Sequence, residues 1–355
     1  MSAAQPDGIP GALVKAVVDR LTQRKQLSPV PAGVRIDGRV CLVTGANSGL
    51  GKAVATDLAR RGGHVLMACR SGHPEAGEDV RRASGSDAVE MLHVDLADLD
   101  SVHALADEVR RGSGRVDFAV FNAGVMPRTV RKSSQGYELM FAVHFLANRL
   151  LIDRMFADGT IRPSGRPGET PRIVFVSSEM HRTAGPIDFD DFGAFTDYGL
   201  RDGLKYYGSS KLHLCTYAQE LSRRLNPRGE VRASVTSLCP GSINSNLVRD
   251  APAFLKPLIR AFTGLFFASP DKAAAPVTYA CCAEDMGRRS GVYLHIMQEK
   301  EVSELAMDEA AGARLWEESE ALLAKHGPPR VADGGDAGAG SPAPTSNEAR
   351  PSSNT

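Results

Sequence analysis

The sequence predicts an α/β protein with a single doubly wound parallel sheet of about seven strands and helices on both faces. Two observations predict this fold class. Short apolar, β-leaning segments alternate with segments of helical periodicity along residues 38–325. The first apolar segment, 40–43, also leads into a turn with glycines at 45, 49 and 51, and a helical segment follows directly. Strand, glycine turn and helix in this order form a common starting unit of doubly wound sheets.

Composition narrows the class of protein. A chain of 355 residues can bury one large core or two small ones. Its 42 basic and 42 acidic residues cancel, so the charge gives no reason to expect a nucleic acid or an anionic membrane as partner. The six cysteines show no C-x-x-C spacing, which predicts reduced thiols in a cytoplasmic protein and no metal site. Neither a secretory signal nor an apolar stretch of the ~18 residues that span a membrane is expected.

The glycine turn predicts a phosphate site. Gly45 permits a tight turn, Gly49 allows a phosphate to approach the backbone, and Gly51 lets the helix pack closely on the strand. Backbone N–H groups at the start of the helix would then face a pyrophosphate. The alternative is a tight turn without a ligand. The loop residues expected at a dinucleotide are Gly45, Asn47, Ser48, Gly49, Leu50 and Gly51.

The spacing Thr44-Gly45-x-x-x-Gly49-x-Gly51 resembles the nucleotide loop of the classical short-chain dehydrogenases/reductases. Further motifs follow in that family's order, and the segments Glu304-Leu-Ala-Met-Asp-Glu and Leu315-Trp-Glu-Glu-Ser resemble its retinol-dehydrogenase-like branch. The resemblance covers about residues 38–325. It implies a Rossmann-type sheet and the interconversion of an alcohol and a carbonyl by hydride transfer.

The end of the second predicted strand, 64–68, bears on the choice of cofactor. An NAD-type site places an acidic residue about 20 positions past the loop, where it holds the ribose 2′-hydroxyl. The residue at that distance here is Arg70, with no acid beside it. An arginine can pair with the 2′-phosphate of NADP, so NADP(H) is the expected cofactor, with NAD(H) left open. The alternative is an ordinary surface arginine. Some NADP-dependent relatives have a basic residue where this chain has Ser48.

The ends of the third and fourth predicted strands, 89–94 and 116–121, carry the next motifs. Without the resemblance, Asp95 would be an unremarkable helix cap. The resemblance implies that the adenine and the rest of the cofactor are lined by Asp95, Leu96, Asn122, Ala123 and Gly124.

A long helical segment, 137–156, departs from the family pattern. Alignment of its apolar residues puts His144 where the catalytic asparagine is expected, and Asn148 lies on a different turn. An imidazole can donate and accept hydrogen bonds and titrates near ~6.5. One hypothesis is that His144 replaces the asparagine in a proton relay and adds a titration near that value. The other is that it is a residue of the helix core.

The fifth predicted strand, 172–176, precedes the residues expected to perform the reaction. Ser178 follows this strand, and Tyr207 and Lys211 share one face of a later helix because they are four positions apart. By resemblance, Ser178 binds the substrate oxygen, Tyr207 exchanges the proton and Lys211 holds the nicotinamide ribose. Activity near neutral pH would need the tyrosine pKa, normally ~10, to fall by roughly 3 units. The segment 179–203 is interpreted as an inserted loop near the site entrance.

The sixth predicted strand, 231–238, leads to the substrate side of the site. By resemblance, Pro240 and Gly241 form a turn under the nicotinamide, and Ser245 meets its carboxamide. The apolar segment 251–268 is interpreted either as packing on the sheet or as a mobile lid that selects lipophilic substrates such as retinoids, steroids or polyketides. A seventh strand, 291–296, and a closing helix, 309–325, complete the predicted domain.

The predicted organisation has three parts. Residues 1–37 form an extension with an amphipathic helix, for which packing on the domain and a partner or peripheral membrane contact are both left open. Residues 38–326 form the dehydrogenase/reductase domain. Residues 327–355 lack leucine, isoleucine and aromatic residues, so a disordered tail is expected.

The resulting hypothesis is an NAD(P)-dependent oxidoreductase acting on a small lipophilic alcohol or carbonyl, with Tyr207 as acid/base. A non-catalytic dinucleotide-binding scaffold or sensor is the rival, because His144 departs from the family pattern. An epimerase or dehydratase on the same fold is a second rival. The substrate, the direction of the reaction and the question of a homo-oligomer are left open.

Overall fold

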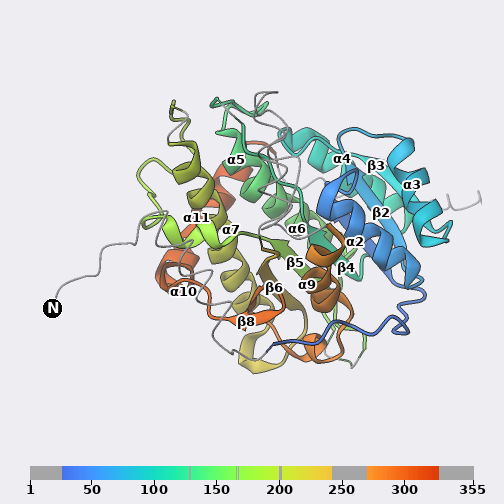
Figure 1. Cartoon of the computed structure of the whole chain (residues 1–355). Helices are drawn as coiled ribbons and strands as arrows, with labels where there is room; N and C mark the ends of the chain where they lie inside the picture. Colours follow the sequence, from blue (N-terminus) through green and yellow to red (C-terminus); the bar gives the residue numbers. More distant parts are fainter. Residues whose placement is uncertain are drawn as a thin grey trace, which may run out of the picture.

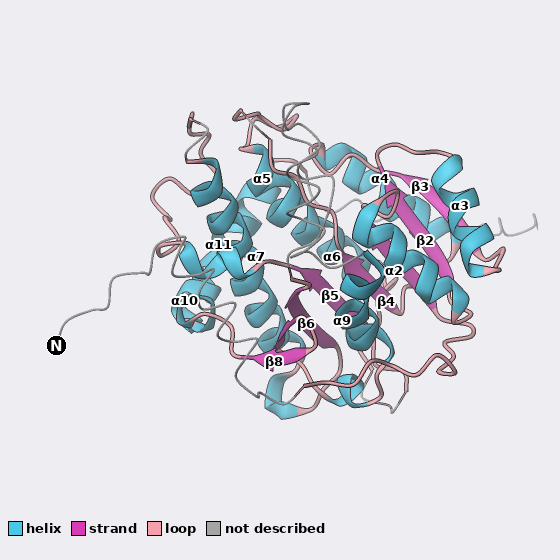
Figure 2. Cartoon of the chain, in the orientation of Figure 1, coloured by secondary structure: helices cyan, strands magenta, loops and turns pink. Residues whose placement is uncertain are grey.

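The computed structural model describes residues 26–127, 129–164, 166, 168–199, 202–241 and 270–327. Within these residues, eight strands form one sheet in the order β3-β2-β1-β4-β5-β6-β7-β8. All neighbouring strands pair in parallel except β7 and β8, which are antiparallel. Figure 2 shows β3 and β8 at the two ends of the sheet. The strands are β1 (Val40–Thr44), β2 (His64–Cys69), β3 (Val89–His93), β4 (Phe118–Phe121), β5 (Arg172–Val176), β6 (Ser234–Cys239), β7 (Val292–His295) and β8 (Gln298–Lys300). The predicted fold class is therefore confirmed.

Helices cover both faces of the sheet. On one face, α2 (Gly49–Arg60), α3 (Glu75–Ser84) and α9 (Pro270–Cys282) share a core with the sheet. On the other face, the core includes α4 (Leu99–Gly112), α6 (Ala147–Ala157), α7 (Gly203–Leu225) and α11 (Glu309–Ala324). Figure 1 shows α2 and α9 packed side by side against the sheet.

The strands β1 and β4 are mainly apolar because both of their faces are buried. In β1, Leu42 contributes to one core, Cys41 and Val43 contribute to the other, and all three have no exposed surface. A strand buried on both faces has no polar face, so its sequence is a continuous apolar segment.

The strand order places a crevice beside β1. The chain passes from β1 outward to β2 and β3, and then returns to β4 on the other side of β1. The connections that leave β1 and β4 therefore separate at their carboxyl ends, which is where doubly wound sheets bind ligands. The glycine turn follows β1 and the Asn122-Ala123-Gly124 motif follows β4 at this point.

The predicted helix over 137–156 is interrupted. It consists of α5 (Leu139–Phe141), a π-helical segment η1 (Ala142–Leu146) and then α6. His144 lies in η1, and the side-chain amide of Asn148 donates a hydrogen bond to the His144 carbonyl at 2.8 Å. Such π-helical bulges are common at functional sites, and apolar periodicity alone does not reveal them.

The segment 179–203 packs against neighbouring helices. It begins with a short 3₁₀ helix, η2 (Glu179–Thr183). Further along, the Phe192 ring meets the Phe141 ring edge-on at 5.3 Å, and the Tyr198 hydroxyl donates to the carboxylate of Glu138 at 2.7 Å. Tyr206 stacks on Tyr198. These contacts join the segment to the start of α5 and to α7.

The helix α11 packs against α7. The guanidinium of Arg149 lies 3.5 Å from the centre of the Trp316 ring, and the guanidinium of Arg224 lies 4.3 Å from it. Trp316 also stacks on Tyr217 of α7. Cation–π pairs of this kind are worth about 0.5–2 kcal/mol each, so the indole joins α6, α7 and α11.

The sequence missed β8, a strand of three polar residues, because it has no apolar pattern. Residues at the start of the described chain also join this edge, since the Leu27 N–H donates to the Met297 carbonyl at 2.8 Å. Further along, the Arg61 side chain donates to the Pro31 carbonyl at 2.8 Å. Residues 26–37 therefore pack on the domain.

Several predictions fall outside the described residues. These are the amphipathic helix within 1–25, Ser245, the apolar segment 251–268 and the tail from 328 to 355. Among the helices in the described ranges, none combines the length and the apolar character needed to cross a bilayer.

Candidate active site

The glycine turn packs against the end of β4. Gly45 and Gly49 have positive φ angles of 66° and 53°, a region that favours glycine. A Cβ on Gly51 would lie 2.4 Å from the Gly45 carbonyl oxygen and 2.5 Å from the amide nitrogen of Asn122. The helix α2 can therefore approach the strand only if residue 51 is a glycine.

Asn122 and Thr44 connect the two strand ends. The amide nitrogen of Asn122 donates to the carbonyl oxygens of Thr44 at 2.9 Å and of Gly45 at 3.3 Å. In return, the Thr44 hydroxyl accepts from the backbone N–H groups of Asn122 and Ala123 at 3.0 and 3.1 Å. The shape of the turn is thus fixed by hydrogen bonds within the protein.

The start of α2 fits the pyrophosphate of a dinucleotide. Ser48 is the N-cap residue, but its side chain makes no capping hydrogen bond, and the first turn carries no acidic residue. The partial positive charge and the N–H groups of this helix end are therefore available to an anion. The side chain of Leu50 belongs to the buried core, so only its backbone could meet a cofactor. Asn47 donates from its side chain to the Ser71 hydroxyl at 3.3 Å.

Arg70 and Asp95 come together at the ends of β2 and β3. Their side chains form an ion pair at 3.7 Å, and the Arg70 side chain is 63% exposed. Asp95 also accepts from the N–H of Ala97 at 2.9 Å, which fixes its carboxylate. Leu96 is buried in the core, so it can offer only its backbone. The two residues that the sequence assigned to the adenosine end of the cofactor are therefore neighbours.

Ser178, Tyr207 and Lys211 also come together. Ser178 caps η2 by accepting from the Met180 N–H at 3.3 Å, and its side chain hydrogen-bonds Tyr207, an interaction that acts to lower the tyrosine pKa. Lys211 is buried and donates to the Val176 carbonyl at 3.0 Å, with its nitrogen 5.7 Å from the centre of the Tyr207 ring. Tyr206 points elsewhere, onto Tyr198.

Burial controls the protonation of this group. Desolvation raises the pKa of Tyr207 to about 12, the neighbouring Cys239 adds to the rise, and the Ser178 hydrogen bond opposes it. Desolvation likewise lowers the pKa of Lys211 to about 8. The protein groups around Tyr207 by themselves raise its pKa, because the burial of the phenolate outweighs the hydrogen bond. The lowered pKa expected for activity near neutral pH includes the positive charge of a bound oxidised nicotinamide and stays a prediction.

His144 is enclosed between the segment that follows β4 and the helix α7. Its Nε2 accepts from the Val125 N–H at 2.9 Å, and its Nδ1 lies 2.8 Å from the Ser210 hydroxyl, which donates to the Tyr207 carbonyl at 2.8 Å. Because a backbone N–H only donates, the hydrogen-bond network assigns the ring proton to Nδ1. Desolvation and the charge of Lys211 hold the His144 pKa well below its usual value. A buried imidazole resists protonation, so this environment favours the hypothesis of a helix-core residue over that of an added titration near ~6.5.

The strand β6 brings the Pro240–Gly241 turn to the same edge of the sheet. Gly241 has a positive φ of 87°, and a Cβ there would lie 3.1 Å from Cγ1 of Ile296. The adjacent Cys239 is the residue whose charge would raise the pKa of Tyr207, which places this strand end beside the tyrosine. Ser245 lies outside the described residues.

Sequence reasoning missed a buried polar cluster next to Ser178. Glu179 accepts from the Tyr293 hydroxyl at 2.7 Å and pairs with Lys300 and Arg182, both at 3.3 Å. Burial alone would raise the Glu179 pKa, but His295, Arg182, the Tyr293 hydroxyl and Lys300 outweigh it and lower the pKa to about 2. These partners come mainly from β7 and β8, more than 100 residues away along the chain, so no local motif could reveal them.

His181 fixes the backbone of Ser178 in the same region. Its Nε2 accepts from the Ser303 N–H at 3.3 Å, so its Nδ1 carries the proton and donates to the Ser178 carbonyl at 2.7 Å. Together with Glu179, this histidine attaches the loop that carries Ser178 to β8 and the segment after it.

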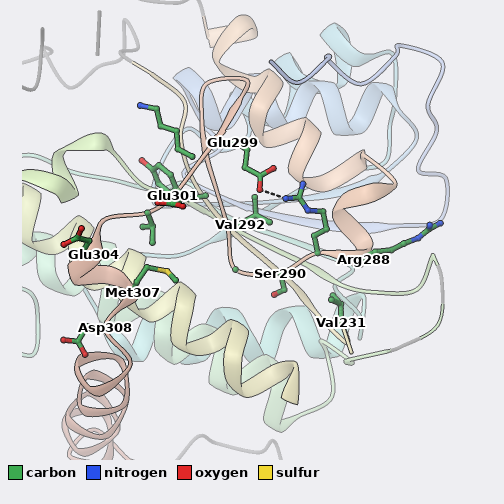
Figure 3. Close-up of a pocket in the computed structure, with 14 residues that line it drawn as sticks. Val231, Arg288, Ser290, Val292, Glu299, Glu301, Glu304, Met307 and Asp308 are labelled. Carbon is green, nitrogen blue, oxygen red and sulfur yellow. Dashed lines mark hydrogen bonds and ion pairs between the residues drawn. The ribbon is translucent and has the colours of Figure 1, made fainter. Parts of the chain in front are cut away.

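A separate groove lies along the edge formed by β7, β8 and α10 (Glu304–Met307), and has a volume of about 920 Å³. Figure 3 shows its mixed lining, with Glu299 from β8 forming an ion pair with a neighbouring arginine, Arg289. None of the site residues predicted from the sequence lines it. The chemistry is therefore assigned to the strand ends around Tyr207 and not to this groove.

Comparisons with known proteins agree with this fold. A family model described as short chain dehydrogenase matches residues 39–187. Human retinol dehydrogenase 13 is 35% identical over 309 residues, covering 84% of this chain and 88% of that protein. Mouse polyprenol dehydrogenase is 33% identical, covering 79% of this chain and 82% of that protein. The crystal structure of an uncharacterised protein from Mycobacterium paratuberculosis has a TM-score of 0.64 and 26% identity, covering 84% of this chain and 98% of that one.

The chain belongs to the short-chain dehydrogenase/reductase family. Within the family, it is a member of the retinol-dehydrogenase-like branch.

The close contact at Gly51 generates a first prediction. Gly51→Ala should abolish dinucleotide binding and destabilise the fold by about 1–3 kcal/mol, because its Cβ would collide with backbone and with Asn122. Gly112→Ala, where a Cβ would meet nothing within 4 Å, is the matched control and should leave both properties unchanged. Thermal unfolding with and without NADPH measures both. An alanine at 51 that preserves the NADPH-induced shift would contradict the packing argument.

The Glu179 cluster predicts a pH dependence. Because the folded-state pKa is lowered from 4.5 to about 2, the stability that Glu179 contributes is present above about pH 4.5 and is lost as the pH falls toward 2. Glu179→Gln should therefore cost about 3 kcal/mol of unfolding free energy at neutral pH, and the difference from wild type should shrink below pH 4.5.

The control for this experiment is Glu284→Gln, since the Glu284 side chain is 86% exposed and pairs only with the surface residue Arg288. Denaturant unfolding at several pH values compares the three proteins. A Glu179→Gln deficit that stays constant from pH 7 to pH 3 would show that the deficit does not come from the charge.

Proposed function

We propose that this protein is an NAD(P)(H)-dependent oxidoreductase that interconverts an alcohol and a carbonyl on a small lipophilic molecule. The observation that carries the proposal is the grouping of Ser178, Tyr207 and Lys211 at the carboxyl ends of β5 and β6, beside a glycine turn that fits a pyrophosphate. Family membership supports the reaction class, because the relatives reported above are named as dehydrogenases.

The side chains take distinct roles. A bound dinucleotide would supply or accept the hydride. Ser178 donates a hydrogen bond from its hydroxyl to the substrate oxygen and orients that oxygen beside Tyr207, whose pKa the Ser178 side chain acts to lower. Tyr207 gives its phenolic proton to that oxygen during carbonyl reduction and removes it during alcohol oxidation. A phenol with a pKa of about 12 is protonated at neutral pH, so the protein alone prepares the tyrosine as a proton donor.

Lys211 is suited to hold the nicotinamide ribose. It is buried, and one of its three donor positions is used by the Val176 carbonyl, which leaves donors for ribose hydroxyls. Its ammonium also stabilises negative charge on the phenolate, and the cost of burying that charge appears in its lowered pKa of about 8. His144 acts as a fixed support between Val125 and Ser210, which sets the position of the turn that carries Tyr207.

Arg70 supports a preference for NADP(H). Its exposed guanidinium lies where the adenosine ribose of a dinucleotide on the glycine turn would end. Asp95 partly neutralises this charge, so the preference depends on the arginine turning from the carboxylate to the 2′-phosphate.

A lipophilic substrate is supported by the names of the relatives, since retinol and polyprenol are both long apolar alcohols. The apolar composition of residues 251–268 agrees with this class. A cytoplasmic location and a homo-oligomer stay predictions of the sequence.

The role of Tyr207 predicts a selective loss. Tyr207→Phe should lower turnover on the order of 10²–10⁴-fold, because the proton donor is removed, while NADPH affinity stays nearly the same. Tyr206→Phe is the matched control, because Tyr206 stacks on Tyr198 and should be dispensable. Steady-state rates on a panel of lipophilic aldehydes and alcohols, with NADPH binding measured in parallel, test this. Near-wild-type turnover by Tyr207→Phe would contradict the proposed reaction.

The cofactor preference is tested at Arg70. Arg70→Ala should weaken NADPH binding by roughly 1.5–3 kcal/mol, as expected for a hydrogen bond to a charged group, and should change NADH binding little. Arg82→Ala removes another exposed arginine, one that pairs with Asp79, and should affect neither cofactor. Isothermal titration of wild type and both variants with each cofactor gives the six affinities. Equal losses for NADPH and NADH would assign Arg70 a structural role.

A further inference from the structure

The turn between β7 and β8 contains an unusual residue. His295 pairs with Gln298, so Ile296 and Met297 alone connect the two strands. Ile296 has a positive φ of 56° and, among the residues that the structure describes, is the one residue other than glycine in that region. The first position of such a turn normally carries glycine, asparagine or aspartate, because a β-branched side chain clashes with the backbone there. The chain therefore keeps a strained residue at this position.

Burial does not explain the isoleucine. The residue is 40% exposed, so the apolar surface that it removes from water is limited. Its N–H donates to the Cys239 carbonyl at 2.7 Å, but a glycine would make the same backbone hydrogen bond. The free energy that offsets the backbone strain must therefore come from the contacts of the Ile296 side chain.

The side chain contacts the Pro240–Gly241 turn. A Cβ added to Gly241 would lie 3.1 Å from Cγ1 and 3.3 Å from Cδ1 of Ile296, so the isoleucine occupies the space beside the Gly241 backbone. Gly241 itself has a positive φ of 87°. Two positive-φ residues thus face each other at the end of β6, next to Cys239 and near the catalytic Tyr207.

We propose that Ile296 is a positioning residue for the cofactor: its side chain holds the Pro240–Gly241 turn in place beside the nicotinamide end of the dinucleotide. This inference rests on the proposed function, because it takes Gly241 as part of the cofactor site. The strained backbone is retained because a glycine at 296 would leave the Gly241 turn without its apolar support.

The test follows the strain through Tm and the contact through NADPH affinity. Ile296→Gly removes both, so its Tm should equal or exceed that of wild type, because the left-handed backbone suits glycine. Its Kd and KM for NADPH should nevertheless rise on the order of 10-fold, since small misplacements of a binding group are costly. Ile296→Val keeps the β-branched side chain and should restore wild-type affinity. Met307→Ala removes another exposed apolar side chain, on α10, and should leave Kd and KM unchanged.

Each result decides the proposal. An Ile296→Gly protein with a raised Tm and an unchanged NADPH Kd would overturn it while leaving the proposed oxidoreductase intact. A large fall in Tm with an unchanged Kd would also overturn it, because Ile296 would then serve only the hairpin. A wild-type protein that binds NADPH without turning over any substrate would count against the proposed function, and its Kd series would still decide the role of Ile296. A wild-type protein that binds no dinucleotide would overturn both.

Discussion

The geometry of this protein depends on the close contact between Gly51 and the turn that follows β1. The α2 backbone reaches the Gly45 carbonyl and the Asn122 amide so closely that no side chain fits between them. The Asn122 amide then joins the end of β4 to the same turn. One set of contacts therefore fixes the direction of α2, the shape of the phosphate turn and the separation of β1 from the connection after β4. A helix end held in this way can present its N–H groups to an anion with little rearrangement.

The side chains proposed to react lie in a region where burial controls charge. Tyr207 and Lys211 have pKa values moved toward their neutral forms, and His144 is held neutral between a backbone N–H and the Ser210 hydroxyl. The Glu179 cluster behaves in the opposite way, because its cationic partners outweigh the cost of burial and keep the carboxylate charged. The loop that carries Ser178 is thus held by the charged carboxylate of Glu179, while Tyr207 remains an uncharged acid.

Support for the site extends far from the strand ends. Tyr207 and Lys211 lie on α7, and α7 is held against α6 and α11 through the indole of Trp316 and the guanidinium groups of Arg149 and Arg224. On the other side, the β7–β8 turn presses Ile296 against Gly241. Elements that contain no reacting group therefore determine where the reacting groups lie.

The sequence by itself determined the fold class and most strand positions, because buried strands are apolar and glycine turns have fixed backbone requirements. Motif spacing also indicated that Ser178, Tyr207 and Lys211 would converge. Tertiary structure alone decided the π-helical bulge at His144, the pairing of Arg70 with Asp95, the Glu179 cluster and the contact of Ile296 with Gly241. It also decided that burial makes the protein groups around Tyr207 raise its pKa. The physical reason is that a pKa, an ion pair or a strained turn depends on burial and on partners distant in the chain, whereas periodicity and motifs report only local order.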